Sequence, residues 1–166
     1  MVSAGSYGIG TLNKSNGTLT NKSTLTVSNF NQSNGTTTNS GNLTIGNANL
    51  GGTLNSTGTL NLTGNVVTRG NLTSTGNLNN RGNWTETNRY TIAANLNNSG
   101  SVNFQNGFEF SNGRLTSSGT VQTNNVFDVF DSIGETGQQD LNYVGLGSSV
   151  PQEVKTSLTD FFLKYL

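Results

Sequence analysis

The chain has 166 residues, a formal net charge of zero and only 10% charged residues. It contains no Cys and no His, which excludes a disulfide framework, thiolate metal ligands, a thiol nucleophile and a histidine general base. Asn, Thr, Gly and Ser together make up more than half of the chain, a composition that would indicate disorder if the apolar residues were not strictly periodic.

A six-residue repeat runs through most of the chain. From Gly52 onward every sixth residue is Gly for six units, and an apolar residue stands two places after each Gly. The apolar pattern continues through Tyr90 to Val102, takes one extra residue near Asn106, and resumes at Leu115. One hexad is too short to bury its own apolar residue, so the units are expected to stack and share a common core.

Each hexad predicts one short strand and one bend. Segments such as 24–27 and 59–62 alternate in polarity and contain β-branched residues, as half-buried strands do. Gly and Asn recur between these segments, and we expect them to supply the positive φ angles of the bends. Three hexads give about 18 residues, which suits one triangular turn of a single-stranded β-helix. Six such turns would form a prism roughly 30 Å long.

Residues about 18 apart match in character, which predicts three inward columns. The spacing shortens by one residue in the hexad at Gly41 and lengthens by one across the insertion. The first column consists of Leu19, Thr37, Leu54, Leu72 and Tyr90. The second consists of Leu25, Leu43, Leu60, Leu78, Leu96 and Leu115. The third consists of Ala48, Val66, Trp84, Val102 and Val121. Trp84 is therefore interpreted as a core residue and not as a platform for stacking sugars.

The end of the chain differs from the repeat array. The sequence predicts an array over residues 1–125, a transition segment over 126–149 and an amphipathic α-helix over 150–166, all in one structural domain. Pro151 and Glu153 suit a first helical turn. The apolar face of the helix would consist of Val150, Val154, Leu158, Phe161, Phe162 and Tyr165. This face either caps the last turn of the coil or docks onto a neighbouring subunit.

Charge is divided between the two parts of the chain. Residues 1–125 hold six Lys and Arg against two Glu, a net charge of +4, whereas residues 126–166 hold six Asp and Glu against two Lys, a net charge of −4. Such a division is either a chance skew of charge on a solvated surface or an attraction between one end of the molecule and the opposite end of a neighbour. Glu86 and Glu109 are 23 residues apart, not one turn, so no paired-carboxylate glycosidase site is expected.

Several phrases of the array resemble the repeats of filamentous-haemagglutinin-type exoproteins. The phrases span residues 41–44, 70–73, 76–83 and 94–100. The resemblance implies a bacterial secreted or surface β-helix associated with adhesion, contact-dependent inhibition or biofilm. The hexads also resemble the left-handed hexapeptide β-helix, although Gly stands where that family usually has Ser, Thr, Ala or Val. The sequence leaves the hand of the coil open.

We therefore expect an all-β solenoid with one of two functions. The first is a non-catalytic structural or adhesive role, most concretely as an extracellular or cell-surface filament subunit whose partner is another copy of the chain. The second is binding of surface glycan by an adhesin or phage tail-type module that does not self-assemble. Ice binding would need a regular Thr lattice, whereas Thr and Asn interchange here. No enzyme activity, metal or cofactor is expected, and no nucleic-acid partner, since the basic residues are few and scattered. No apolar run is long enough to span a membrane, and no signal peptide is visible.

Overall fold

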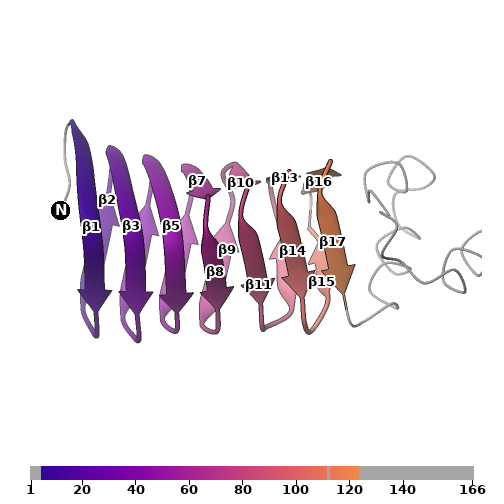
Figure 1. Cartoon of the computed structure of the whole chain (residues 1–166), viewed down its shortest axis with the longest axis horizontal. Coiled ribbons are helices and arrows are strands. Elements are labelled where there is room, and N and C mark those ends of the chain that lie inside the picture. Colours follow the sequence, from indigo (N-terminus) through magenta and orange to yellow (C-terminus); the bar gives the residue numbers. More distant parts are fainter. Residues whose placement is uncertain (1–4, 112, 124–166) are drawn as a thin grey trace, which may run out of the picture.

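A computed structural model describes residues 5–111 and 113–123, which form seventeen β-strands and no helix. The strands coil into a β-solenoid of about six turns with a spacing of about 18 residues, as the repeat predicts (Figure 1). Every strand pairing between turns is parallel. The transition segment over 126–149 and the helix over 150–166 lie outside the described residues.

The strands build three faces, which each turn of the coil visits in order. The first face contains β2 (Thr18–Asn21), β4 (Thr36–Asn39), β6 (Thr53–Ser56), β9 (Asn71–Ser74), β12 (Tyr90–Ile92) and β15 (Phe108–Phe110). The second contains β7 (Thr59–Leu62), β10 (Leu78–Asn80), β13 (Asn95–Asn98) and β16 (Arg114–Ser117). The third contains β8 (Asn65–Thr68), β11 (Asn83–Glu86), β14 (Ser101–Phe104) and β17 (Thr120–Thr123). In the earliest turns β1 (Ser6–Lys14), β3 (Thr24–Gln32) and β5 (Asn42–Leu50) each span the second and third faces.

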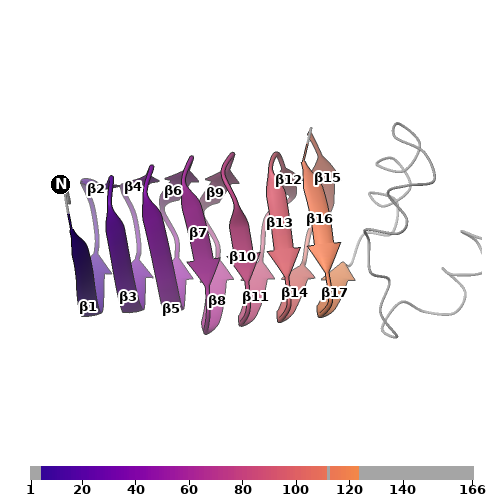
Figure 2. The same cartoon turned by 90° about the horizontal axis from the view of Figure 1, so that it is seen from above.

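The coil is right-handed. In Figure 1 the chain advances from left to right, while the strands of the third face, nearest the viewer, run downward. In Figure 2, seen from above, the strands of the second face run toward the side that faces the viewer in Figure 1. The path is therefore clockwise for an observer who looks along the axis from the N-terminal end, in keeping with the usual hand of parallel crossovers. This hand distinguishes the coil from the left-handed hexapeptide β-helix.

The strand register places the predicted columns inside the coil. The second column runs without a break through Tyr7, Leu25, Leu43, Leu60, Leu78, Leu96 and Leu115. The third runs through Leu12, Phe30, Ala48, Val66, Trp84, Val102 and Val121. The first joins Leu19, Thr37, Leu54 and Leu72, followed in the next turns by Tyr90 and Phe108. All these residues are buried except those of the first turn, Tyr7, Leu12 and Leu19.

Most strands also turn a second side chain inward two residues later, as the alternation of a strand requires. The hexad pattern did not reveal these positions. Several hold apolar residues with no more than 2% exposure, namely Val27, Ile45, Leu50, Leu62, Ile92 and Phe104. Others hold buried polar residues, namely Asn21, Gln32, Asn39, Ser56, Thr68, Ser74, Asn80, Glu86 and Asn98. The core is therefore wider than three columns and is partly polar.

The turns before Gly52 are not built from hexads. The inward residues Leu25 and Phe30 are only five apart, because β3 continues round the corner without a break. The next inward residue, Thr37, follows seven places later, across a corner at which Gly35 has a φ of 76°. The short and long corners compensate, so the turn keeps its length and the columns stay in register.

The extra residue of the sixth turn lies between Phe110 and Arg114 and not near Asn106. Phe110 pairs with the residue 18 places earlier, whereas Arg114 pairs with Asn95, 19 places earlier. The corner between β15 and β16 therefore absorbs the insertion, and the strands on both sides keep their inward residues.

Most corner glycines are required by close stacking and not by positive φ. Among the described glycines, positive φ occurs at Gly5, Gly17, Gly35 and Gly107. At Gly58, in contrast, an added Cβ would lie less than 3.0 Å from the carbonyl oxygen of Gly41 in the preceding turn. Gly82 and Gly100 meet the preceding turn in the same way. The expectation that the repeat glycines supply positive φ is therefore wrong, because the backbones of successive corners lie in contact.

This stacking predicts the effect of adding one methyl group at a corner. Gly58→Ala is expected to lower the free energy of unfolding by about 1–3 kcal/mol, because the backbones of two turns must move apart. Gly10→Ala is the matched control, since a Cβ there would meet nothing within 4 Å, and its effect should stay within about 0.5 kcal/mol. Urea unfolding measures the free energy of unfolding of both variants. Equal losses in the two would show that close stacking is not the reason for Gly at this corner.

Candidate functional site

The described residues offer three places where function could reside. They are a buried carboxyl group, the polar outer faces, and the open N-terminal end of the coil. Within residues 5–111 and 113–123, no group of three or more His, Cys, Asp or Glu could hold a metal ion. No helix in this part of the chain is long and apolar enough to cross a membrane.

Glu86 places a carboxyl group inside the coil. Its side chain is 1% exposed and occupies the second inward position of β11. The hydroxyl of Thr68, which lies beside Glu86 in the preceding turn, donates to Oε2, and the backbone N–H of Asn88 donates to Oε1 at 3.0 Å. Trp84 Nε1 donates to the Thr68 hydroxyl oxygen at 3.1 Å. The carboxyl group is thus held by Thr68 in the preceding turn of the coil and by the backbone of Asn88 in the corner that follows β11.

Aromatic rings pack around this carboxyl group. The ring centroid of Trp84 lies 5.1 Å from that of Tyr90 and 5.5 Å from that of Phe104, and Phe104 is the neighbour of Glu86 in the next turn. Burial in this low-dielectric region raises the pKa of Glu86 to about 7, although its hydrogen bonds from Thr68 and the corner oppose the shift. Burial and the charge of Glu86 also raise the pKa of Tyr90. At 1% exposure Glu86 cannot meet a substrate, so its chemistry is the uptake and release of a proton within the core.

Other inward polar side chains form ladders along the axis. Asn21 Nδ2 donates to Asn39 Oδ1 at 2.8 Å, and Asn39 Nδ2 donates to Ser56 Oγ at 2.9 Å. On the second face Asn80 Nδ2 donates to Asn98 Oδ1 at 2.7 Å. Asn39 Nδ2 also donates to the carbonyl oxygen of Thr59, and Asn80 Nδ2 to that of Ser101, so these amides satisfy backbone groups at the start of strands in the next turn. These ladders explain how a core with so many polar residues satisfies most of them.

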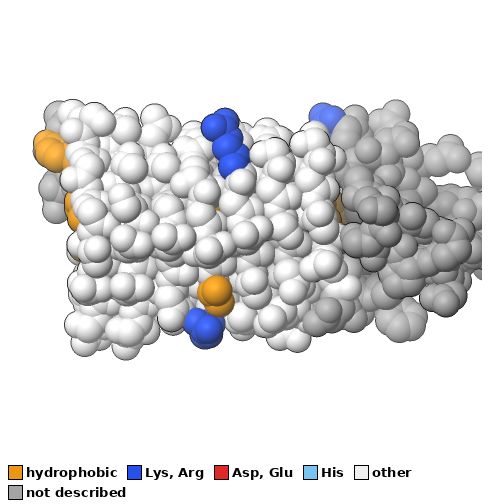
Figure 3. Space-filling view, viewed as in Figure 1, with side chains coloured by type: hydrophobic (Ala, Val, Ile, Leu, Met, Phe, Trp, Pro, Cys, Tyr) orange, Lys and Arg blue, Asp and Glu red, His pale blue; other side chains and the backbone are white. Residues whose placement is uncertain are grey.

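The outer faces carry mainly uncharged amides and hydroxyls. Figure 3 shows one such face, on which hydrophobic side chains gather at the N-terminal end and few charges appear. Outward Asn residues form exposed ladders, in which Asn79 donates to Asn61 at 2.9 Å and Asn97 donates to Asn79 at 2.9 Å. A repeating array of hydrogen-bonding groups therefore follows the axis of the coil.

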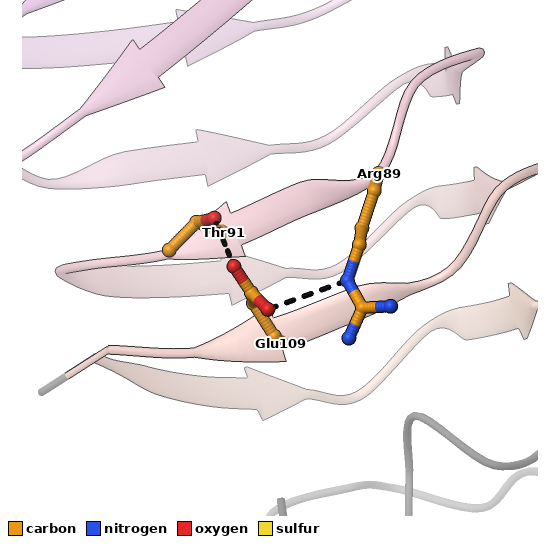
Figure 4. Close-up of polar contacts among 3 residues, drawn as sticks. All are labelled: Arg89, Thr91 and Glu109. Carbon is orange, nitrogen blue, oxygen red and sulfur yellow. Dashed lines mark hydrogen bonds and ion pairs between the residues drawn. The ribbon is translucent and has the colours of Figure 1, made fainter.

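A small charged cluster lies on the outside of the first face. Glu109 on β15 contacts Arg89 Nε at 3.3 Å and accepts a hydrogen bond from Thr91 Oγ1 at 2.8 Å (Figure 4). The side chains of the ion pair are 47% and 46% exposed, so the pair contributes at most about 1 kcal/mol. Glu109 points outward and Glu86 inward, so the two carboxylates of the array do not share a site.

The N-terminal turn is the open end of the coil. Among the described residues β1 pairs only with β3, and β2 only with β4, so one edge of each strand has no strand beside it. Tyr7 is 46% exposed, and Ile9, Leu12 and Leu19 are only partly buried. The sequence of β1 contains no Pro, and its only charge is Lys14 at its last position. An edge of this kind is a template for another strand.

No family model, no curated protein and no solved structure matches this chain. The structure supports a β-helix repeat with turns of about 18 residues. The resemblance to filamentous-haemagglutinin-type repeats remains an interpretation of the repeat phrases.

The buried carboxyl group predicts that the coil loses stability as the pH rises. The pKa of Glu86 is raised from 4.5 to about 7, so the folded chain holds a proton that the unfolded chain releases between these values. The stabilisation of the folded chain by this bound proton is therefore complete below pH 4.5 and is lost as the pH rises through 7. The shift corresponds to about 3 kcal/mol at most.

Two variants isolate this contribution. Glu86→Gln keeps the shape and removes the titration, so its free energy of unfolding should fall less between pH 4.5 and 7 than that of the wild type. Glu109→Gln is the control for the loss of a carboxyl group at an exposed position. Urea unfolding at a series of pH values measures both slopes, and a wild-type slope in Glu86→Gln would show that this group is not responsible.

Proposed function

We propose that the chain is a non-catalytic structural β-solenoid, most concretely a subunit that stacks end to end into an extracellular or bacterial cell-surface filament. The observation that carries the proposal is the open N-terminal turn. Among the described strands it has a paired strand on one side only, and it presents to a neighbour the same inward columns that each inner turn presents to the next. A second copy placed there would continue the coil.

The energetics of the open turn are consistent with assembly. Full burial of a large apolar side chain contributes roughly 1.5–3 kcal/mol, and less where the side chain is already partly covered. Association costs roughly 4–15 kcal/mol in lost freedom of motion. Burial of Tyr7, Ile9, Leu12 and Leu19 is therefore of the same order as this cost. Backbone pairing along β1 and β2 has to supply the remaining free energy of association that holds two copies together.

The composition and the placement of the carboxylates also support a structural role. The residues that could carry chemistry are few, because the chain has neither His nor Cys, and the two carboxylates of the coil lie on opposite sides of its wall. The extracellular placement rests on the resemblance of the repeats to secreted exoproteins.

Negative-stain electron microscopy of the purified chain at several concentrations tests the proposal. We expect fibres of uniform width, close to that of one solenoid, whose length grows with protein concentration because copies add at the ends. Tyr7→Asp should shorten the fibres, since it places a charge on the open column, whereas the exposed mid-coil change Asn65→Asp should not. Compact particles at every concentration would contradict self-assembly.

A second candidate function, glycan binding without self-assembly, is favoured by two shallow grooves. One groove is lined by Thr57, Thr59, Thr75, Asn77, Ala94 and Asn95. The other is lined by Asn79, Arg81, Asn97, Ser99, Thr116 and Ser118. Aligned hydroxyl and amide groups beside small apolar surfaces match the hydroxyls and ring faces of a sugar chain.

A glycan array tests the second candidate. Binding that is lost in Asn79→Ala and kept in Asn47→Ala, an outward Asn away from both grooves, would support it. A blank array at high protein concentration would count against it.

A further inference from the structure

The open end of the coil carries an inward-pointing cation. Lys14 pairs with Gln32, which pairs with Leu50, and both of these residues are buried. Lys14 therefore occupies an inward position of the first turn, where its Nζ donates to the backbone oxygen of Asn34 at 3.2 Å. Lys22 follows β2 in the same turn and is exposed. No Asp or Glu occurs before Glu86, so this end of the molecule is positive.

An inward cation restricts what can cover the open turn. A covering layer without a carboxylate would bury the Lys14 ammonium with no opposite charge beside it, which is costly. Partial burial already lowers the pKa of Lys14. A second copy placed with its own N-terminal end against this one would bring four Lys side chains together. The layer that fits must supply both apolar side chains and carboxylates.

The C-terminal part of the same sequence has this chemistry. Residues 126–166 carry a net charge of −4, and Val126, Phe127, Val129 and Phe130 alternate there with Asp128 and Asp131. β17, the last described strand, lies at the end of the coil opposite β1, roughly 30 Å away by strand spacing (Figure 1). The positive open end of one copy and the strand that precedes the negative segment in the sequence thus lie at opposite ends of the coil.

We propose that the N-terminal turn is a docking surface for residues 126–166 of a second copy. In this arrangement, which rests on the proposed self-assembly, apolar side chains of the segment cover Tyr7, Leu12 and Leu19, and its carboxylates contact Lys14 and Lys22. The contact is head to tail, so every copy has one donor end and one acceptor end. Assembly by this contact gives a filament whose two ends differ, and the filament continues to grow because the contact does not close a ring.

Charge reversal in the full-length chain tests the contact. One variant carries Lys14→Glu and Lys22→Glu, and the other carries Asp128→Lys, Asp131→Lys and Glu135→Lys. Each variant alone brings like charges together at every junction, so assembly should need at least about tenfold more protein than the wild type. In an equimolar mixture every junction between unlike copies is again attractive. Assembly should return to within about threefold of the wild-type concentration.

Further variants separate the possible failures. Arg69→Glu, the same reversal at an exposed mid-coil position, should assemble like the wild type. Circular dichroism reports whether Lys14→Glu disturbs folding. If it does, Lys22→Glu alone repeats the test at a fully outward residue. Wild-type assembly by the variant reversed at 128, 131 and 135 would overturn this docking contact but leave self-assembly intact. Failure of the unmodified chain to assemble would overturn both proposals.

Discussion

Each turn of the coil must lie one strand spacing from the turn before it, and the rest of the structure depends on this stacking. Parallel pairing between turns fixes the register, so a residue inside one turn has a residue inside the next turn as its neighbour. The same spacing brings the corners together, which leaves no room for a Cβ at Gly58 or Gly82. Apolar columns, polar ladders and corner glycines are three consequences of one constraint.

Stacking also determines which polar residues the core can hold. An inward Asn is tolerated where the next turn supplies another amide or hydroxyl, as in the ladder of Asn21, Asn39 and Ser56. Glu86 has one neighbour of this kind, Thr68, and the aromatic ring of Phe104 on its other side. Burial in these surroundings raises its pKa, although the hydrogen bond from Thr68 opposes the shift. The first turn differs from the inner turns, because within the described part of the chain its strands pair with the second turn alone.

The sequence predicted the architecture because the column residues repeat at a constant spacing of six from Leu54 to Val102. It did not reveal the second inward position of each strand, where residues as different as Leu62, Thr68 and Asn80 occur. The reason for the corner glycines was also hidden, since it is a contact between residues about 18 apart and not a local φ preference. The sequence did not reveal that the third column extends into the first turn, because spacings of five and seven obscure Leu12 as a column residue.

The central claim is that the first turn is the place at which another copy adds. Amide hydrogen exchange of the full chain, measured below and above the concentration of assembly, tests it most directly. The account predicts that protection of β1 and β2 rises on assembly, while protection of β5, which is already paired on both sides, stays the same. Assembly with unchanged protection of β1 and β2 would contradict it.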